Sequence, residues 1–198
     1  MVSAEHGEPE LLRRYLAGEQ ACFERLYDAH QKPCFDFIRR MLGAADDATA
    51  EDLHQEVWIA VARQAASFDA GRARFVTWLF TIARNKVMDH FRRQPGLVQL
   101  TGEAGDAALD AIADSPGAFE ISPERIAQNR QLAAALLREV QALPFAQRET
   151  FVLFAHQELS LEEVSQVTRV GLETAKSRLR YARATLRLRL AGWKVEHA

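Results

Sequence analysis

The chain has 198 residues, of which 48% are hydrophobic and 26% are charged, and its formal net charge is −2. This is the composition of an ordinary globular protein, and it excludes a disordered tail, a collagen-like repeat and a mucin-like stalk. The near-neutral total charge gives no indication of nucleic-acid binding, but basic and acidic residues are segregated along the chain.

The cysteine content and the length of the apolar runs exclude further classes of protein. Cys22 and Cys34 are too few for a disulfide scaffold, and the spacing of His30 and Cys34 supplies only two metal-like ligands. We therefore predict packed thiols and no metal. Residues 1–10 carry three glutamates and do not resemble a signal peptide, and no apolar run approaches the ~18 residues of a membrane helix. We expect a cytoplasmic protein that is not inserted in a membrane.

Before the middle of the chain, apolar residues recur at steps of three and four, which is typical of amphipathic helices. A short helix is predicted around Leu11, a second helix ends at Gly43, and a third buries Leu53 and Val57. A fourth helix is predicted over 75–93. No stretch alternates with period two, so we predict no sheet.

One stretch interrupts this pattern. Residues 94–124 hold three of the six prolines, four of the ten glycines, six acidic residues and no Lys or Arg. Such a composition between periodic segments predicts a flexible acidic linker. It separates a domain over 9–93 from a second domain over 125–192.

The second domain is also predicted to be helical. Ser160 and Glu163 have the spacing of a capping box, residues 169–171 form a tight break, and a long helix follows. A helix, a three-residue turn and a helix are typical of the helix-turn-helix motif. The predicted helices cover 126–143, 145–157, 161–168 and 172–190. The predicted fold class is all-α, with two small helical domains joined by a flexible acidic linker and a helix-turn-helix in the C-terminal domain.

The last predicted helix is strongly basic. Residues 169–194 hold eight bases and one acid, and an apolar stripe from Leu172 to Leu186 marks the buried face. An α-helix fits the major groove, where Lys and Arg contact guanine edges or phosphates. A solvated basic face is the alternative, which the preceding short helix and turn make less favourable. The candidate contacts to duplex DNA are Glu173, Thr174, Lys176, Ser177, Arg178, Arg180, Tyr181 and Arg183.

A second basic surface is predicted on the helix over 75–93. Residues 72–93 hold six bases and one acid, with aromatic residues between them. Bases beside aromatic rings suit single-stranded nucleic acid, and the loop over 68–75 could hold an extruded base. Trp78 and Phe80 are interpreted as core residues instead. The candidate contacts are Phe68, Arg72, Arg74, Phe75, Arg84, Asn85, Lys86, Asp89, His90 and Arg93.

These segments resemble a known family. Ala50-Glu-Asp-Leu-His-Gln-Glu56, followed by the segment from Phe75 to Arg93, looks like the first domain of bacterial sigma factors. The pairs Leu143-Pro144, Arg148-Glu149 and Leu159-Ser160, followed by Thr174 to Leu179, resemble the second domain. Two such domains with only a linker between them are similar to the extracytoplasmic-function (ECF) group of the sigma-70 family.

The resemblance implies a specificity subunit of bacterial RNA polymerase and not an enzyme. Its implied partners are core RNA polymerase and promoter DNA, with no cofactor and no small-molecule substrate. Asp52, Gln55 and Glu56 would dock on the clamp helices of the largest catalytic subunit. The helix over 75–93 would melt and read the minus-ten element, and the last helix would read the minus-thirty-five element as duplex. The linker would thread toward basic polymerase channels, and an anti-sigma factor is an expected further partner.

The turn of the helix-turn-helix departs from the family pattern. Thr168-Arg169 stands where Leu-Gly is usual, and Glu173 replaces a glycine before Thr174. A positive φ at Arg169 would cost on the order of 1 kcal/mol. Without it, the two helices would cross differently.

Two other classes of function remain open at this point. The runner-up is a one-component transcription regulator, in which a helical sensor is joined to a helix-turn-helix that binds duplex DNA without polymerase. A helical enzyme is the third class, and the sequence contains no HExxH, P-loop or nucleophile-elbow motif.

Overall fold

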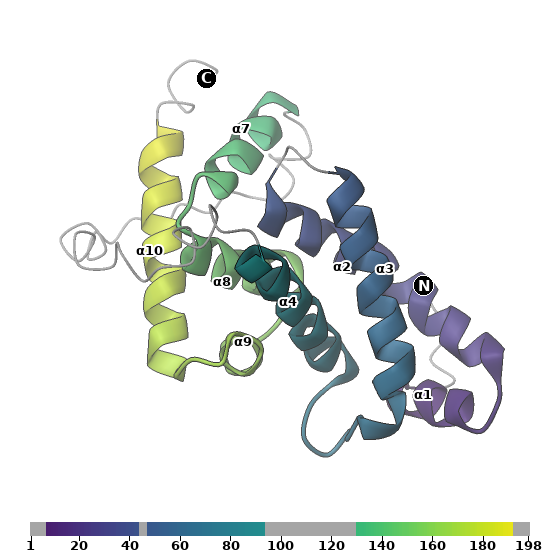
Figure 1. The fold of residues 1–198 in the computed structure, drawn as a ribbon. Coiled ribbons are helices and arrows are strands. Elements are labelled where there is room, and N and C mark those ends of the chain that lie inside the picture. Colours follow the sequence, from purple (N-terminus) through teal and green to yellow (C-terminus); the bar gives the residue numbers. More distant parts are fainter. Residues whose placement is uncertain (1–6, 44–46, 94–129, 192–198) are drawn as a thin grey trace.

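A computed structural model describes residues 7–43, 47–93 and 130–191, and within these ranges the regular structure is entirely helical (Figure 1). The all-α prediction is therefore confirmed. The helices are α1 (Glu8–Leu16), α2 (Gln20–Leu42), α3 (Asp47–Gln64), the short 3-10 helix η1 (Ala65–Ser67), α4 (Phe75–Arg93), α7 (Arg130–Gln141), α8 (Phe145–His156), α9 (Leu161–Thr168) and α10 (Leu172–Leu190). The predicted linker over 94–124 lies outside the described residues, so the predicted domain limits stay a prediction.

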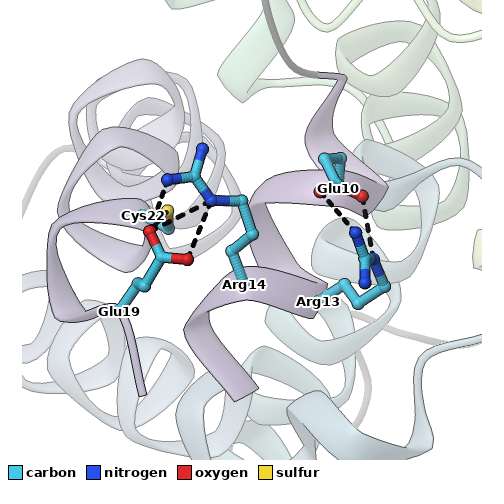
Figure 2. A network of polar contacts seen from close by, with 5 residues as sticks. All are labelled: Glu10, Arg13, Arg14, Glu19 and Cys22. Carbon is cyan, nitrogen blue, oxygen red and sulfur yellow. Dashed lines mark hydrogen bonds and ion pairs between the residues drawn. The ribbon is translucent and has the colours of Figure 1, made fainter. Parts of the chain in front are cut away.

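A tight corner joins α1 to α2 (Figure 2). Gly18 adopts a φ of 104°, which glycine tolerates because it has no Cβ. The Arg14 guanidinium donates to the Glu19 carboxylate, with 3.0 Å between Nε and Oε1. The buried Cys22 thiol donates to the same carboxylate at 3.9 Å. These contacts connect the last turn of α1 to the first turn of α2.

Helix α2 continues for 23 residues through Pro33. Proline has no backbone N–H, so one intrahelical hydrogen bond is missing at this point, yet tertiary packing keeps the helix continuous. The helix ends before Gly43, as the apolar spacing predicted. Next to the proline, burial raises the pKa of the Cys34 thiol to about 12, which is the behaviour of a packed thiol.

The helices of the described ranges include neither a membrane span nor a metal-ligand cluster. None of their helices is both long and apolar enough to cross a bilayer. Nor does this part of the chain contain a group of three or more His, Cys, Asp or Glu side chains that could hold a metal ion. His30, one of the two metal-like residues, forms a 2.7 Å hydrogen bond with Glu8 instead.

One hydrophobic core joins the helices before residue 93 to those after residue 130. Helix α4 lies between α2 and α3 on one side and α8 and α9 on the other (Figure 1). Phe80 of α4 packs edge-on against Phe37 of α2, with 5.4 Å between ring centroids. Phe91 of α4 packs edge-on against Phe145 of α8 at 5.5 Å. Both halves of the chain therefore pack on the same helix.

Helices α9 and α10 form the predicted helix-turn-helix. The Glu163 backbone amide donates to Ser160 Oγ at 3.2 Å, and the Ser160 amide donates to the Glu163 carboxylate at 2.9 Å. The predicted capping box is thus present. Arg169 ends α9 in the left-handed conformation, with φ 58° and ψ 39°. Because Arg169 takes the conformation usually taken by glycine, Gly171 is free to adopt an extended conformation before α10.

Replacing Arg169 by glycine should raise the free energy of unfolding by up to about 1 kcal/mol, because glycine removes the Cβ clash of the left-handed conformation. Urea denaturation measures this change. Ala134→Gly is the control, since Ala134 is exposed inside α7 and glycine there should cost about 1 kcal/mol. A stability loss in Arg169→Gly would contradict the assignment of strain to this turn.

Candidate polymerase and nucleic-acid interface

A polar groove runs between α3 and α4. It is lined by Thr49, Asp52, Leu53, Glu56, Lys86, Asp89, His90 and Arg93. Within it Lys86 Nζ donates to Glu56 Oε2 at 2.8 Å, and this hydrogen bond lowers the pKa of Glu56. The groove brings together residues that the sequence assigned separately to polymerase binding and to minus-ten DNA.

The predicted polymerase-binding face lies on the outer side of α3. Asp52 and Gln55 are exposed and Glu56 is half-buried, whereas Leu53 and Val57 are buried in the core. Side chains three and four residues apart share one face of a helix, so the apolar pair orients the polar residues outward. This face is therefore accessible to a partner.

The candidate minus-ten residues lie in three different environments: on the exposed surface, in the groove, and at the boundary with the C-terminal half. Arg72, Arg74 and Arg93 are exposed, and the half-buried Lys86, Asp89 and His90 line the groove. Phe68 and Asn85 are half-buried, and Arg84 points to the C-terminal half of the molecule, where it meets an acidic partner. The tenth candidate is Phe75.

Phe75 is not on the surface, and its assignment to an accessible DNA-binding loop was wrong. It is fully buried at the first position of α4, with ring centroids 6.0 Å from Phe68 and 5.9 Å from Trp78. A phenylalanine at the start of a helix gains more from burial among aromatic rings than from exposure. Phe68, the half-buried partner, remains at the edge of the loop.

The loop before α4 forms a compact turn. The amide of Gly71 donates to the Asp69 side chain at 2.8 Å, and the amide of Arg72 donates to the Asp69 carbonyl at 3.1 Å. Aspartate commonly stabilises turns in this way. The turn leaves the Arg72 side chain exposed at the start of the basic surface.

On α10 the structure divides the candidate DNA contacts into accessible and buried residues. Glu173, Thr174, Lys176, Arg180 and Arg183 are exposed, and Ser177 is half-buried. Lys176 Nζ pairs with Glu173 Oε1 at 2.7 Å, so the acidic residue that departs from the family pattern is matched by a neighbouring base.

Arg178 and Tyr181 are each only 6% exposed, and their placement on the outward basic face was wrong. Arg178 lies three residues after Ala175 and four before Ala182, so it shares the buried side of α10 with them. Its charge suggested exposure, but its position in the helical period predicts burial. Tyr181, three residues further along, lies on the flank of the same buried side.

Arg178 is buried near Glu149 of α8, whose carboxylate is the centre of a cluster of arginines. Glu149 Oε1 accepts from Arg84 Nε at 2.7 Å, and the side chain of Glu149 is 2% exposed. Burial raises the pKa of Glu149, although Arg84, Arg178 and Arg148 act in the opposite direction. The sequence marked Glu149 only as part of the family resemblance and gave no sign of its contact with Arg84, because the two residues lie 65 positions apart along the chain.

A second carboxylate from the C-terminal half reaches α4. Thr77 Oγ1 donates to Glu163 Oε1 at 2.8 Å, and Arg74 Nη1 lies 3.2 Å from the same oxygen. Burial raises the pKa of Glu163, but hydrogen bonds from the Ser160 amide and Thr77, together with Arg74, outweigh it and lower the pKa overall. The capping box identified Glu163 from sequence, but no local signal indicated its contact with α4.

The low pKa of Glu163 predicts a pH dependence of stability. Its stabilising contribution is present above the ordinary carboxyl pKa of 4.5 and is lost as the pH falls through the lower folded-state value. Between about pH 6 and pH 3.5, the thermal midpoint of the wild-type chain should fall more steeply than that of Glu163→Gln. Scanning calorimetry measures both slopes, with the exposed neighbour Glu162→Gln as the control that should follow the wild type. Equal slopes for wild type and Glu163→Gln would contradict the prediction.

Comparison with known proteins relates this arrangement to a family. The family model "Sigma-70 region 2" matches residues 26–95. The chain is 36% identical to the ECF RNA polymerase sigma factor BldN of Streptomyces coelicolor over 159 residues, covering 80% of this chain and 56% of BldN. It therefore spans a little over half the length of BldN. It is 28% identical to the ECF RNA polymerase sigma factor SigW of Bacillus subtilis over 179 residues, covering 90% of this chain and 94% of SigW.

A solved structure has the same fold. The sigma factor RpoE of Bartonella quintana, in complex with the anti-sigma factor NepR, superposes with a TM-score of 0.61 and 22% sequence identity. The match covers 88% of this chain and 98% of that chain. At this identity the likeness concerns the arrangement of helices alone.

Proposed function

We propose that this chain, which belongs to the extracytoplasmic-function group of the sigma-70 family, binds core RNA polymerase and directs transcription initiation at specific promoters. The observation that carries the proposal is an exposed acidic face on α3 beside two separate basic helical surfaces, on α4 and α10. A one-component regulator would need only the surface on α10. The proposed role is that of an initiation factor and involves no cofactor.

The N-terminal helices would make the contacts with polymerase and with the melted promoter. Asp52, Gln55 and Glu56 would dock on the clamp helices, since their carboxylates and amide face outward beside a buried apolar stripe. The neighbouring groove residues Lys86 and His90 would face the minus-ten element. In this assignment residues 9–93 form one working unit, and residues 94–124 connect it to a second unit over 125–192.

The second unit would read the minus-thirty-five element as duplex. The exposed residues of α10 follow a helix-turn-helix corner, which is the geometry that places a helix in the major groove. Glu173 is then either neutralised by Lys176 or free to accept from a cytosine amine. An anti-sigma factor remains the expected regulatory partner, and we propose the cytoplasm, where core polymerase acts, as the location.

Run-off transcription with purified core polymerase tests the proposal. Templates from a promoter library should yield specific transcripts only when the chain is added. Tight binding to duplex DNA with no change in transcription would favour the one-component regulator instead.

Reversing the charge of Asp52 should abolish binding to core polymerase, because the exposed carboxylate would become a like charge for a basic partner surface. A pull-down assay measures the binding of the Asp52→Lys variant to core polymerase, and circular dichroism checks that the variant stays folded. Glu51→Lys is a matched control, since Glu51 is also exposed on α3 but does not line the groove. If the Asp52→Lys variant bound core polymerase as well as the wild type does, Asp52 would not be part of the interface.

Lys176→Ala should weaken binding to duplex DNA and lower the slope of log affinity against log salt concentration by about 1, as expected for the loss of one phosphate contact. Fluorescence anisotropy with a labelled duplex measures both. Lys32→Ala, an exposed lysine on α2, controls for loss of charge. An unchanged affinity and slope would count against α10 as the DNA-reading helix.

A further inference from the structure

One acidic residue stands at the start of the basic helix α10. Glu173 is the single acid beside eight bases in residues 169–194. Its side chain is 84% exposed, and that of Lys176, almost one turn further along, is 48% exposed. Lys176 Nζ donates to Glu173 Oε1 at 2.7 Å. The pair therefore lies on the outward side of the helix, next to the exposed Thr174.

The pair can rearrange without harm to the fold. Exposed ion pairs three residues apart on a helix add little stability, because water solvates both charges when the contact opens. A carboxylate has two oxygens that accept several hydrogen bonds, and an ammonium has three donors. One contact between Glu173 and Lys176 therefore allows both side chains to bind a further partner at the same time.

The place of Glu173 in the motif indicates what that partner is. In a helix-turn-helix, residues at the N-terminal end of the second helix contact base edges in the major groove. Glu173 is the second residue of α10 and follows the turn formed by Arg169 and Gly171. An ionised carboxylate only accepts hydrogen bonds. Glu173 therefore needs a base that offers a donor.

Cytosine is the base that suits a carboxylate in the major groove. Guanine presents the acceptors N7 and O6 there, and thymine presents the acceptor O4. Adenine presents its N6 amine beside the acceptor N7, which repels a carboxylate, whereas cytosine presents its N4 amine without such a neighbour on the same base. An acid at this position therefore discriminates between bases, and the glycine that is usual there in the family has no side chain to do so.

Lys176 offsets the repulsion between an acid and the phosphates of DNA. Hydrogen bonding to Glu173 and the charge of Glu173 raise the pKa of Lys176, and the charge of Glu162 on α9 acts in the same direction. The ammonium thus stays protonated beside the carboxylate and cancels its charge. A second N–H of the same ammonium can meet a phosphate, which agrees with the salt dependence expected of Lys176→Ala.

We propose that Glu173 is a specificity-determining residue of α10, whose carboxylate accepts from the N4 amine of one cytosine in the minus-thirty-five element while Lys176 stays bound to it. The inference rests on the proposed function, because it takes α10 as the helix that reads duplex DNA. Neutralisation by Lys176 and contact with cytosine are then two parts of one arrangement. One cytosine of the recognised sequence depends on Glu173.

The sequences that the holoenzyme selects test this role. The chain is assembled with core polymerase and mixed with duplexes in which the minus-thirty-five element is randomised, and the bound fraction is sequenced. The wild type should enrich cytosine at one position roughly five- to hundredfold over the other bases. Glu173→Ala should lose the enrichment at that position alone and, with one negative charge fewer, bind an unrelated duplex about two- to fivefold more tightly. Damage to the fold would not combine these two effects.

Glu162→Ala is the matched control, because Glu162 is an exposed acid whose charge also acts on Lys176 but which lies on α9. It should raise the affinity for an unrelated duplex and keep the cytosine. Glu173→Lys is a second variant. An ammonium cannot accept from an amine but donates to guanine, so guanine should replace cytosine at the same position.

The same cytosine in the motifs of the wild type, Glu173→Ala and Glu173→Lys would overturn the inference, and so would a wild-type motif in which no cytosine depends on Glu173. If the wild type enriches no sequence and starts no transcript with core polymerase, the proposed function fails and the inference fails with it. A specific transcript together with an identical motif in all variants leaves the proposed function standing and removes only the role of Glu173.

Discussion

The arrangement depends on the burial of α4, because both halves of the chain pack on this helix. Its apolar side, with Leu79 and Val87, completes the core with α2 and α3. Its other side carries the buried Thr77 and the half-buried Arg84, whose donors need hydrogen-bond partners where water has little access. Two carboxylates from α8 and α9 supply them. The C-terminal half is thus held on α4 both by the shared apolar core and by these hydrogen bonds.

The local part of this fold could be predicted from sequence, because its causes are local. The apolar spacing gave the limits of α4 and α10, and the Ser160–Glu163 pair marked the start of α9. Arg169 shows the limit of such reasoning. Two conformations were compatible with its departure from the family pattern, and the structure adopts the left-handed one. The steric cost of a left-handed arginine did not by itself show whether Arg169 would accept this strain or whether α9 and α10 would cross at a different angle.

The errors arose where charge was taken as a sign of exposure and where an aromatic ring was placed in a loop. Arg178 is buried beside Glu149, and Phe75 is buried between Phe68 and Trp78. In both cases the position in the helical period was a better guide than the residue type. The pairing of Arg84 with Glu149 could not be read from sequence, because it depends on how two halves of the chain meet in space.

A chain with a net charge of −2 can still bind DNA if its basic residues are gathered on separate surfaces. Within the described residues, Glu149 accepts from Arg84 at a mostly buried position, whereas the pair of Glu163 with Arg74 lies at the exposed edge of the same boundary. Within the same described residues, Lys176, Arg180 and Arg183 of α10 and Asp52 of α3 are exposed. In the proposed function, duplex DNA would meet the exposed bases of α10, and core polymerase would meet the face of α3 that carries Asp52.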